Sequence, residues 1–181
     1  SHDHLAVLRA YEEAKAAGHE NINMDLIAGL PGDTPEGFEN TLRQVLALEP
    51  TNITVHTLAL KKAAKLYYEK RTELPTGAQV ARMLESGNQA LKAGNYRPYY
   101  LYRQKYMTGS FENVGWSRHG FDNLYNIYMM EELHSILSLG AGGMTKTVRD
   151  GKISRLSNPK YPKEYIRDIA TIAAKKREVT L

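Results

Sequence analysis

The chain has 181 residues, of which 42% are hydrophobic and 24% charged, and its formal net charge is +4. This length and composition are typical of a soluble globular protein with one hydrophobic core. The chain has no cysteine, which excludes a disulfide framework, a thiolate zinc site and a cysteine-ligated iron–sulfur cluster within it. No apolar run reaches the roughly 18 residues of a membrane span, and no secretory pattern is visible, so we expect a cytoplasmic protein without a membrane partner.

The first 60 residues predict a helix followed by a strand–helix–strand unit. A helix is expected over Asp3–Ala17, and a strand over Ile22–Ala28, where apolar and polar residues alternate. The next helix begins at Pro35 and ends before Pro50, and a second strand is expected over Asn52–Leu60. Such a unit within about 40 residues predicts a parallel strand pair with a right-handed crossover.

The rest of the chain predicts a mixed succession of helices and strands. The expected elements are a helix over 76–94 that opens with a capping box, a strand over 99–107, a short strand over 136–141, a hairpin of 145–149 and 152–156, and a helix over 161–176. Asp150 and Gly151 predict a type I′ turn in the hairpin.

Several familiar motifs do not fit. The glycine-rich stretch at 29–34 lacks the lysine of a P-loop, and the one at 140–145 has threonine where a dinucleotide fingerprint needs its third glycine. The six histidines show no metal-ligand spacing beyond the His2 and His4 pair, so we interpret them as ordinary surface or core residues. No serine lies in a Gly-x-Ser-x-Gly sequence.

Asp25 is a carboxylate in an otherwise buried strand that ends in a glycine turn. In an α/β barrel, ligands bind at the carboxyl ends of the strands, so an inward Asp25 beside Ile27 suits a nucleoside. The carboxylate would accept hydroxyl hydrogens from a ribose, and the isoleucine would pack against a flat ring. From spacing alone, a capping or solvated role for Asp25 stays open.

Three segments carry a resemblance to a known family. The run NINMDLIAGLPGDTPEGFENTL resembles the Asp-Leu-Ile-x-Gly-Leu-Pro segment of the oxygen-independent coproporphyrinogen III oxidases. The later runs PYYLYRQKYMTGSFENVGWS and LSLGAGGMTKTV resemble the coproporphyrinogen dehydrogenase branch found in Firmicutes. The resemblance implies an α/β fold: the C-terminal part of a partial (β/α)6 radical-SAM barrel over residues 1–72, followed by an α+β C-terminal extension over 73–181.

The resemblance also implies an activity, namely oxidative decarboxylation of coproporphyrinogen III to protoporphyrinogen IX in haem biosynthesis. In that family a [4Fe–4S] cluster reduces S-adenosylmethionine (SAM), and the resulting 5′-deoxyadenosyl radical abstracts hydrogen from propionate side chains. By position, Asp25 is expected to bind the SAM ribose, while Ile27 and the backbone at Ala59 contact adenine. No catalytic acid or base and no metal ligand is carried over.

The family's Cys-x-x-x-Cys-x-x-Cys cluster loop is absent from this sequence. We therefore expect a truncated chain or a split reading frame that is inactive by itself. Its open sheet edge would favour self-association or pairing with the missing N-terminal half of the barrel. Two alternatives stay open: a haem-binding chaperone of the same family, and a non-catalytic α/β binding module.

The tyrosine-rich strand over 99–107 has two interpretations. Arg103 and Lys105, with Lys61 or Lys62, would pair with the carboxylates of a porphyrinogen or haem. Equally, tyrosines at every second position are typical of any half-buried strand. The order of elements does not predict a base-stacking module, so no nucleic-acid partner is expected.

Overall fold

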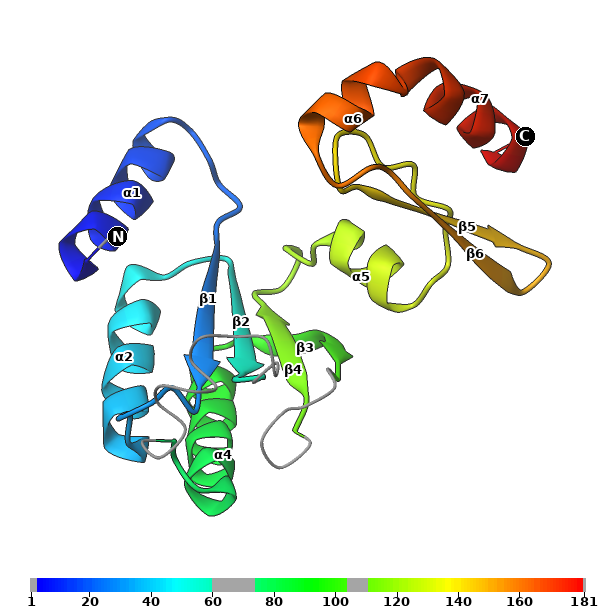
Figure 1. Cartoon of the computed structure of the whole chain (residues 1–181). Helices are drawn as coiled ribbons and strands as arrows, with labels where there is room; N and C mark the ends of the chain where they lie inside the picture. The colour runs from blue at the N-terminus through cyan, green and yellow to red at the C-terminus, as the bar shows by residue number, and fades with distance from the viewer. Residues whose placement is uncertain (1–2, 60–73, 104–110, 181) are drawn as a thin grey trace. The chain divides into compact units, whose positions relative to one another are not determined.

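The computed structural model describes residues 3–59, 74–103 and 111–180, and the chain divides after Asn123 into two compact units. Figure 1 shows the helices and strands along the chain. Their mixture confirms the predicted α/β class. Within the described ranges, no helix is both long and apolar enough to span a lipid bilayer.

The first unit is built on one mixed β-sheet. Its described elements are α1 (His4–Ala16), β1 (Asn23–Ala28), α2 (Pro35–Leu48), β2 (Asn52–Thr57), α4 (Gly77–Ala93), β3 (Arg97–Tyr102) and β4 (Asn113–Ser117). The strand order is β1-β2-β4-β3. Strands β1 and β2 run parallel, whereas β4 is antiparallel to both β2 and β3. The parallel pair joined through α2 confirms the predicted strand–helix–strand unit.

Side-chain caps determine where the two long helices of this sheet begin. The Gly37 backbone N–H donates to Thr34 Oγ1 at 3.1 Å, and Pro35 is the first residue of α2. Thr76 and Gln79 form the predicted capping box, in which the Thr76 backbone N–H donates to Gln79 Oε1 at 2.8 Å. Both helices therefore begin where the sequence predicts, because these contacts satisfy otherwise unpaired N–H groups.

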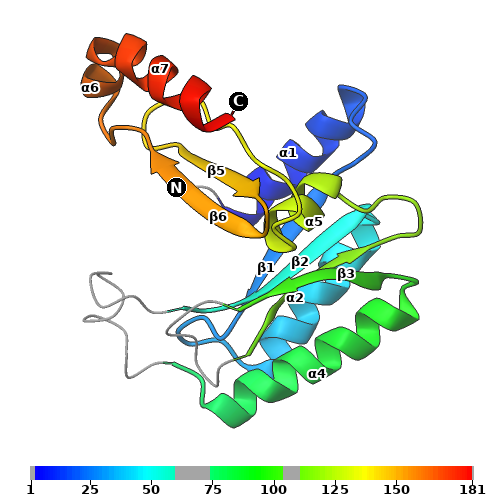
Figure 2. The same ribbon diagram turned by 90° about the vertical axis from the view of Figure 1, so that its right-hand side faces the viewer.

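The hydrophobic core lies between the sheet and helices α2 and α4, which cover one face of the sheet (Figure 2). Leu26 and Ala28 of β1, and Ile53 and Val55 of β2, are at most 7% exposed. They pack with buried residues of the two helices, of β4 and of the connection between α4 and β3, namely Phe38, Leu42, Val45, Met83, Leu91, Tyr96 and Trp116. Since successive strand residues point to opposite faces, this burial places Asp25 on the face away from α2 and α4.

The second unit consists of short elements. Its described helices and strands are α5 (Leu124–Met130), β5 (Met144–Arg149), β6 (Lys152–Ser157), α6 (Pro162–Arg167) and α7 (Ile169–Thr180). Asp150 and Gly151 have φ angles of 48° and 72°, and Arg149 pairs with Lys152. These positive φ angles at both central residues confirm the predicted type I′ hairpin. The buried residues described in this unit are all polar or charged: Thr145, Lys146, Thr147, Asn158 and Lys176.

Strands β2, β3 and β4 differ from the sequence prediction. Strand β2 ends at Thr57, because its backbone N–H donates to the Asn113 side-chain Oδ1 at 2.7 Å instead of to a strand partner. Strand β3 begins at Arg97 and ends at Tyr102, and residues 104–107 of the expected strand lie outside the described residues. Strand β4 was not predicted, since five residues with a central glycine show no clear alternation.

Two predictions in the second unit were wrong. The strand expected over 136–141 is only an isolated bridge between Ile136 and Lys146. Beyond it, the Ser138 backbone N–H donates to a threonine hydroxyl instead of to a neighbouring strand. The single helix expected over 161–176 is two helices, α6 and α7, separated at Asp168.

The first compact unit extends beyond the domain division that the sequence suggested at 72/73. Strand β4 pairs with β2 through Ile53–Trp116 and Val55–Val114, and β3 pairs with β4. Helix α4 packs on the same core through Met83. Residues on both sides of position 72 therefore share one sheet and one core.

Gly115 gives a direct test of this sheet. A Cβ atom at Gly115 would lie 1.8 Å from a ring carbon of Tyr100. That ring is confined, because it stacks on Tyr102 at 6.3 Å and meets the edge of Tyr99 at 4.8 Å. We expect Gly115→Ala to lower the free energy of unfolding by about 1–3 kcal/mol, as overpacking does, in urea titrations followed by Trp116 fluorescence.

The matched control is Gly77→Ala, because an added Cβ at Gly77 has nothing within 4 Å and alanine favours a helix. Removing the ring by Tyr100→Ala in the Gly115→Ala background should recover part of the stability that Gly115→Ala loses. Equal stability of Gly115→Ala and the unchanged chain would show that the Tyr100 ring does not occupy this space.

Candidate functional site

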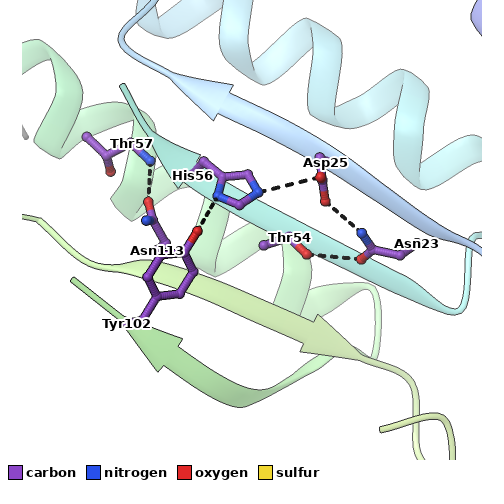
Figure 3. A network of polar contacts seen from close by, with 7 residues as sticks. All are labelled: Asn23, Asp25, Thr54, His56, Thr57, Tyr102 and Asn113. Atoms are coloured by element: carbon purple, nitrogen blue, oxygen red, sulfur yellow. Dashed lines mark hydrogen bonds and ion pairs between the residues drawn. The ribbon is translucent and has the colours of Figure 1, made fainter. Parts of the chain in front are cut away.

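A connected set of polar side chains occupies the sheet face opposite α2 and α4 (Figure 3). Its centre is Asp25 of β1, whose Oδ2 lies 3.6 Å from Nε2 of His56 on β2. In the parallel register Asp25 lies beside Thr54, and Ile27 lies beside His56. His56 therefore reaches Asp25 along the diagonal between neighbouring strands.

Both carboxylate oxygens of Asp25 have a nearby partner. The Asn23 side-chain N–H donates to Asp25 Oδ1 at 2.6 Å, and the Thr54 hydroxyl donates to Asn23 Oδ1 at 3.0 Å. On the other side, His56 Nδ1 lies 3.2 Å from the Tyr102 hydroxyl. The network thus runs from β1 through β2 to β3, and it orients a carboxylate whose side chain remains 60% exposed.

The charge of Asp25 follows from these contacts. The neighbouring His56 holds the pKa of the Asp25 carboxyl below its ordinary value, against an opposing effect of burial, and the Asn23 amide adds to the lowering. Asp25 is therefore an anion at neutral pH, with lone pairs open to solvent. Such a group can accept hydrogen bonds from a pair of hydroxyl groups.

Apolar surface lies next to this carboxylate. Ile27, two residues further along β1, is 41% exposed, and Gly29 then turns the chain with a φ of 88°. A charged acceptor beside an exposed aliphatic side chain suits a ligand that joins hydroxyl groups to a flat ring. Among the described residues, no three His, Cys, Asp or Glu side chains are grouped to hold a metal ion.

The structure places two of the expected nucleoside-binding residues on one face of β1 and the third just after β2. Asp25 and Ile27 share one face of β1. Ala59 is half-buried and follows β2, whose backbone stays beside β1 because the Leu58 N–H donates to the Ala28 carbonyl at 3.0 Å. Ala59 therefore lies just beyond the C-terminal end of the parallel pair.

The expected substrate residues are only partly described. Arg103 lies just after β3, and its guanidinium donates to Glu112 Oε1 at 2.9 Å, with both side chains exposed. Lys105, Lys61 and Lys62 lie outside the described residues. The structure thus shows an ion pair at Arg103 and leaves the role of this residue as a prediction.

Sequence reasoning missed His56 and Tyr102 as members of the site. Alternation in β2 put His56 opposite the core-facing residues, which was a usable signal once a parallel pair with β1 was expected. Nothing in the sequence indicated that Tyr102 would lie close to His56. Strand β4 lies between β2 and β3, and Tyr102, which pairs with Asn113 of β4, comes within reach of His56 across this strand.

The lowered pKa of Asp25 predicts a contribution to stability that depends on pH. A carboxyl whose folded pKa is depressed stabilises the native state above its unfolded value of about 3.9, and this stabilisation is lost as the pH falls through the folded pKa. Asp25→Asn should therefore flatten the fall in unfolding free energy below about pH 4. Because the side chain is mostly exposed, we expect less than about 1 kcal/mol at neutral pH.

This prediction is checked by urea titrations of the unchanged chain and Asp25→Asn between about pH 2.5 and pH 7, the range that spans the ordinary carboxyl pKa. Glu39→Gln, an exposed carboxylate on α2, is the control and should leave the acid slope as it is. Identical pH profiles for the unchanged chain and Asp25→Asn would rule out the coupling between Asp25 and His56.

Comparisons with known proteins find relatives whose names refer to haem or its precursors. No protein-family model matches it. It is 42% identical over 161 residues to the oxygen-independent coproporphyrinogen-III oxidase-like protein HemZ of Bacillus subtilis, covering 87% of this chain and 32% of that protein. It is 28% identical over 167 residues to the heme chaperone HemW of Haemophilus influenzae, covering 92% of this chain and 40% of that protein. The chain therefore spans less than half the length of these relatives.

A solved structure has the same fold. The coproporphyrinogen III oxidase HemN from Escherichia coli, described as a radical SAM enzyme, superposes with a TM-score of 0.66 at 21% identity, over 94% of this chain and 39% of that one. The predicted resemblance is thus confirmed in sequence by the HemZ relative and in fold by the HemN structure. The chain belongs to the oxygen-independent coproporphyrinogen III oxidase family.

Proposed function

We propose that this chain contributes the nucleoside-binding wall of a radical SAM oxidoreductase that oxidatively decarboxylates coproporphyrinogen III to protoporphyrinogen IX. The observation that carries the proposal is the ionised Asp25 beside exposed Ile27 on the uncovered face of the parallel β1–β2 pair. In this proposal Asp25 accepts hydroxyl hydrogens from the SAM ribose. Ile27 and the backbone at Ala59 contact adenine.

The residues present fit SAM and do not fit the iron–sulfur cluster. An anionic acceptor next to an aliphatic side chain suits a ribose joined to a flat base. A [4Fe–4S] cluster requires thiolate ligands, and the chain has no cysteine, so the cluster would be held by residues outside these 181. SAM bound here would supply hydrogen-atom abstraction after its reductive cleavage, and the residues described here would bind and orient its nucleoside.

The same proposal assigns places to the rest of the chain. Residues 1–72 would form the last β/α units of a partial (β/α)6 barrel, and residues 73–181 an α+β extension that begins by adding β4 and β3 to the same sheet. Arg103 and Lys105 would meet substrate carboxylates. A substrate propionate could replace Glu112 as the ion-pair partner of Arg103 at a small cost in free energy, because an exposed ion pair is worth about 0–1 kcal/mol. A cytoplasmic location and self-association stay predictions.

The test is the affinity of the full-length protein for SAM. Replacing Asp25 by alanine removes the charged acceptor, and we expect isothermal titration calorimetry to show binding weaker by about 1–3 kcal/mol, the scale of a hydrogen bond to a charged group. Glu39→Ala, an exposed carboxylate on α2, is the control. An unchanged affinity in Asp25→Ala would remove the proposed site.

A second candidate function is haem binding by a chaperone, which the 28% identity to HemW over 92% of this chain favours. An activity assay separates these two functions. It contains the full-length protein with reconstituted cluster, a reductant, SAM and coproporphyrinogen III. Decarboxylated product, detected by liquid chromatography, supports the oxidoreductase. Tight haem binding in absorbance titrations, without any product, supports the chaperone instead.

A further inference from the structure

Asp25 contacts His56, and His56 in turn contacts Tyr102. We infer that His56 and Tyr102 are positioning residues that hold the Asp25 carboxylate in the orientation required to bind a ribose diol. The inference rests on the proposed nucleoside-binding role of Asp25. It adds two residues from two further strands to that site.

The first step concerns the freedom of the Asp25 side chain. Asp25 is 60% exposed, so packing alone does not restrict its rotamers. Its Oδ1 is fixed by the Asn23 amide at 2.6 Å, and its Oδ2 faces His56 Nε2 at 3.6 Å. A carboxylate held from both sides loses less conformational entropy when a ligand binds, because its orientation already exists in the free protein.

The second step concerns the proton on the His56 ring. An ionised carboxylate only accepts hydrogen bonds, so Asp25, whose Oδ2 lies 3.6 Å from Nε2, favours the tautomer with the proton on that nitrogen. In the neutral ring the other nitrogen, Nδ1, is then an acceptor, and the Tyr102 hydroxyl at 3.2 Å is placed to donate to it. Tyr102 thereby selects the tautomer that presents Nε2–H to Asp25.

The third step concerns how the two residues are held. The His56 side chain is only 26% exposed, and its ring meets the Tyr102 ring edge-on at 6.3 Å between centroids. Tyr102 in turn stacks on Tyr100, whose ring covers the backbone of Gly115. The imidazole is thus confined by a tyrosine pair that is anchored on the sheet. This support sets it apart from a histidine that is merely solvated.

The tautomer can be measured in this chain without any ligand. Long-range proton–nitrogen NMR spectra at about pH 8, above the ordinary histidine pKa of about 6.5, should show His56 with a protonated Nε2 and an unprotonated Nδ1. Tyr102→Phe removes the donor and should give a mixture of the two tautomers. A proton on Nδ1 in the unchanged chain would overturn the inference.

The effect on binding is measured in the full-length protein with SAM. We expect His56→Leu and Tyr102→Phe each to weaken SAM binding by about 3- to 10-fold, the range of one ordinary hydrogen bond. His56→Gln should restore most of the affinity, because its amide N–H can reach Asp25 in place of Nε2–H. In the Asp25→Ala background, His56→Leu should have no further effect. His19→Leu, an exposed histidine after α1, is the control.

Failure of the inference can be told apart from failure of the proposed function. If Asp25→Ala binds SAM as tightly as the unchanged protein, the nucleoside site itself is wrong. If Asp25→Ala weakens binding while His56→Leu and Tyr102→Phe do not, only the positioning role is overturned. Circular dichroism melting identifies a variant that fails to fold. The conservative His56→Gln variant then decides, since it retains a donor at the same place.

Discussion

The parallel register of β1 and β2 is the constraint on which the rest of the site depends. It places Asp25 beside Thr54 and Ile27 beside His56. Because Leu26 and Ala28 must be buried against α2 and α4, the intervening residues have to face the other way. A shift by a single residue would bury the carboxylate and expose the core, so hydrophobic burial on one face fixes the polar chemistry on the other.

The antiparallel half of the sheet supplies what a parallel pair alone would lack. Strand β4 adds to the far side of β2 and brings β3 into the sheet. A glycine at position 115 leaves room for the Tyr100 ring, and Tyr102 stacks parallel to it with its hydroxyl at His56. The Asn113 side-chain amide oxygen accepts a hydrogen bond from the Thr57 backbone N–H, where β2 ends. The orientation of a carboxylate on β1 thus depends on side chains from two other strands, β2 and β3, which β4 holds in one sheet.

The second compact unit is stabilised differently from the first. Its described buried residues are polar or charged, and hydrogen bonds join its segments. The Lys146 ammonium donates to the Met129 carbonyl at 3.2 Å and lies 3.8 Å from Glu132. A unit of this size with so little buried apolar surface has a small hydrophobic contribution to its stability. Its type I′ turn and side-chain hydrogen bonds therefore carry more of its structure than a core does.

The sequence by itself determined the helix starts at Pro35 and Gly77, the β1–α2–β2 unit, the hairpin turn and the family, because each depends on neighbouring residues or on a short contiguous motif. It also placed Asp25 and Ile27 on the same face of one strand. The tertiary structure alone decided that β4 joins β2, that β2 ends at Thr57, and that His56 and Tyr102 join Asp25. These features are contacts between residues about 30 to 60 positions apart, and local periodicity holds no information about which distant strands become neighbours.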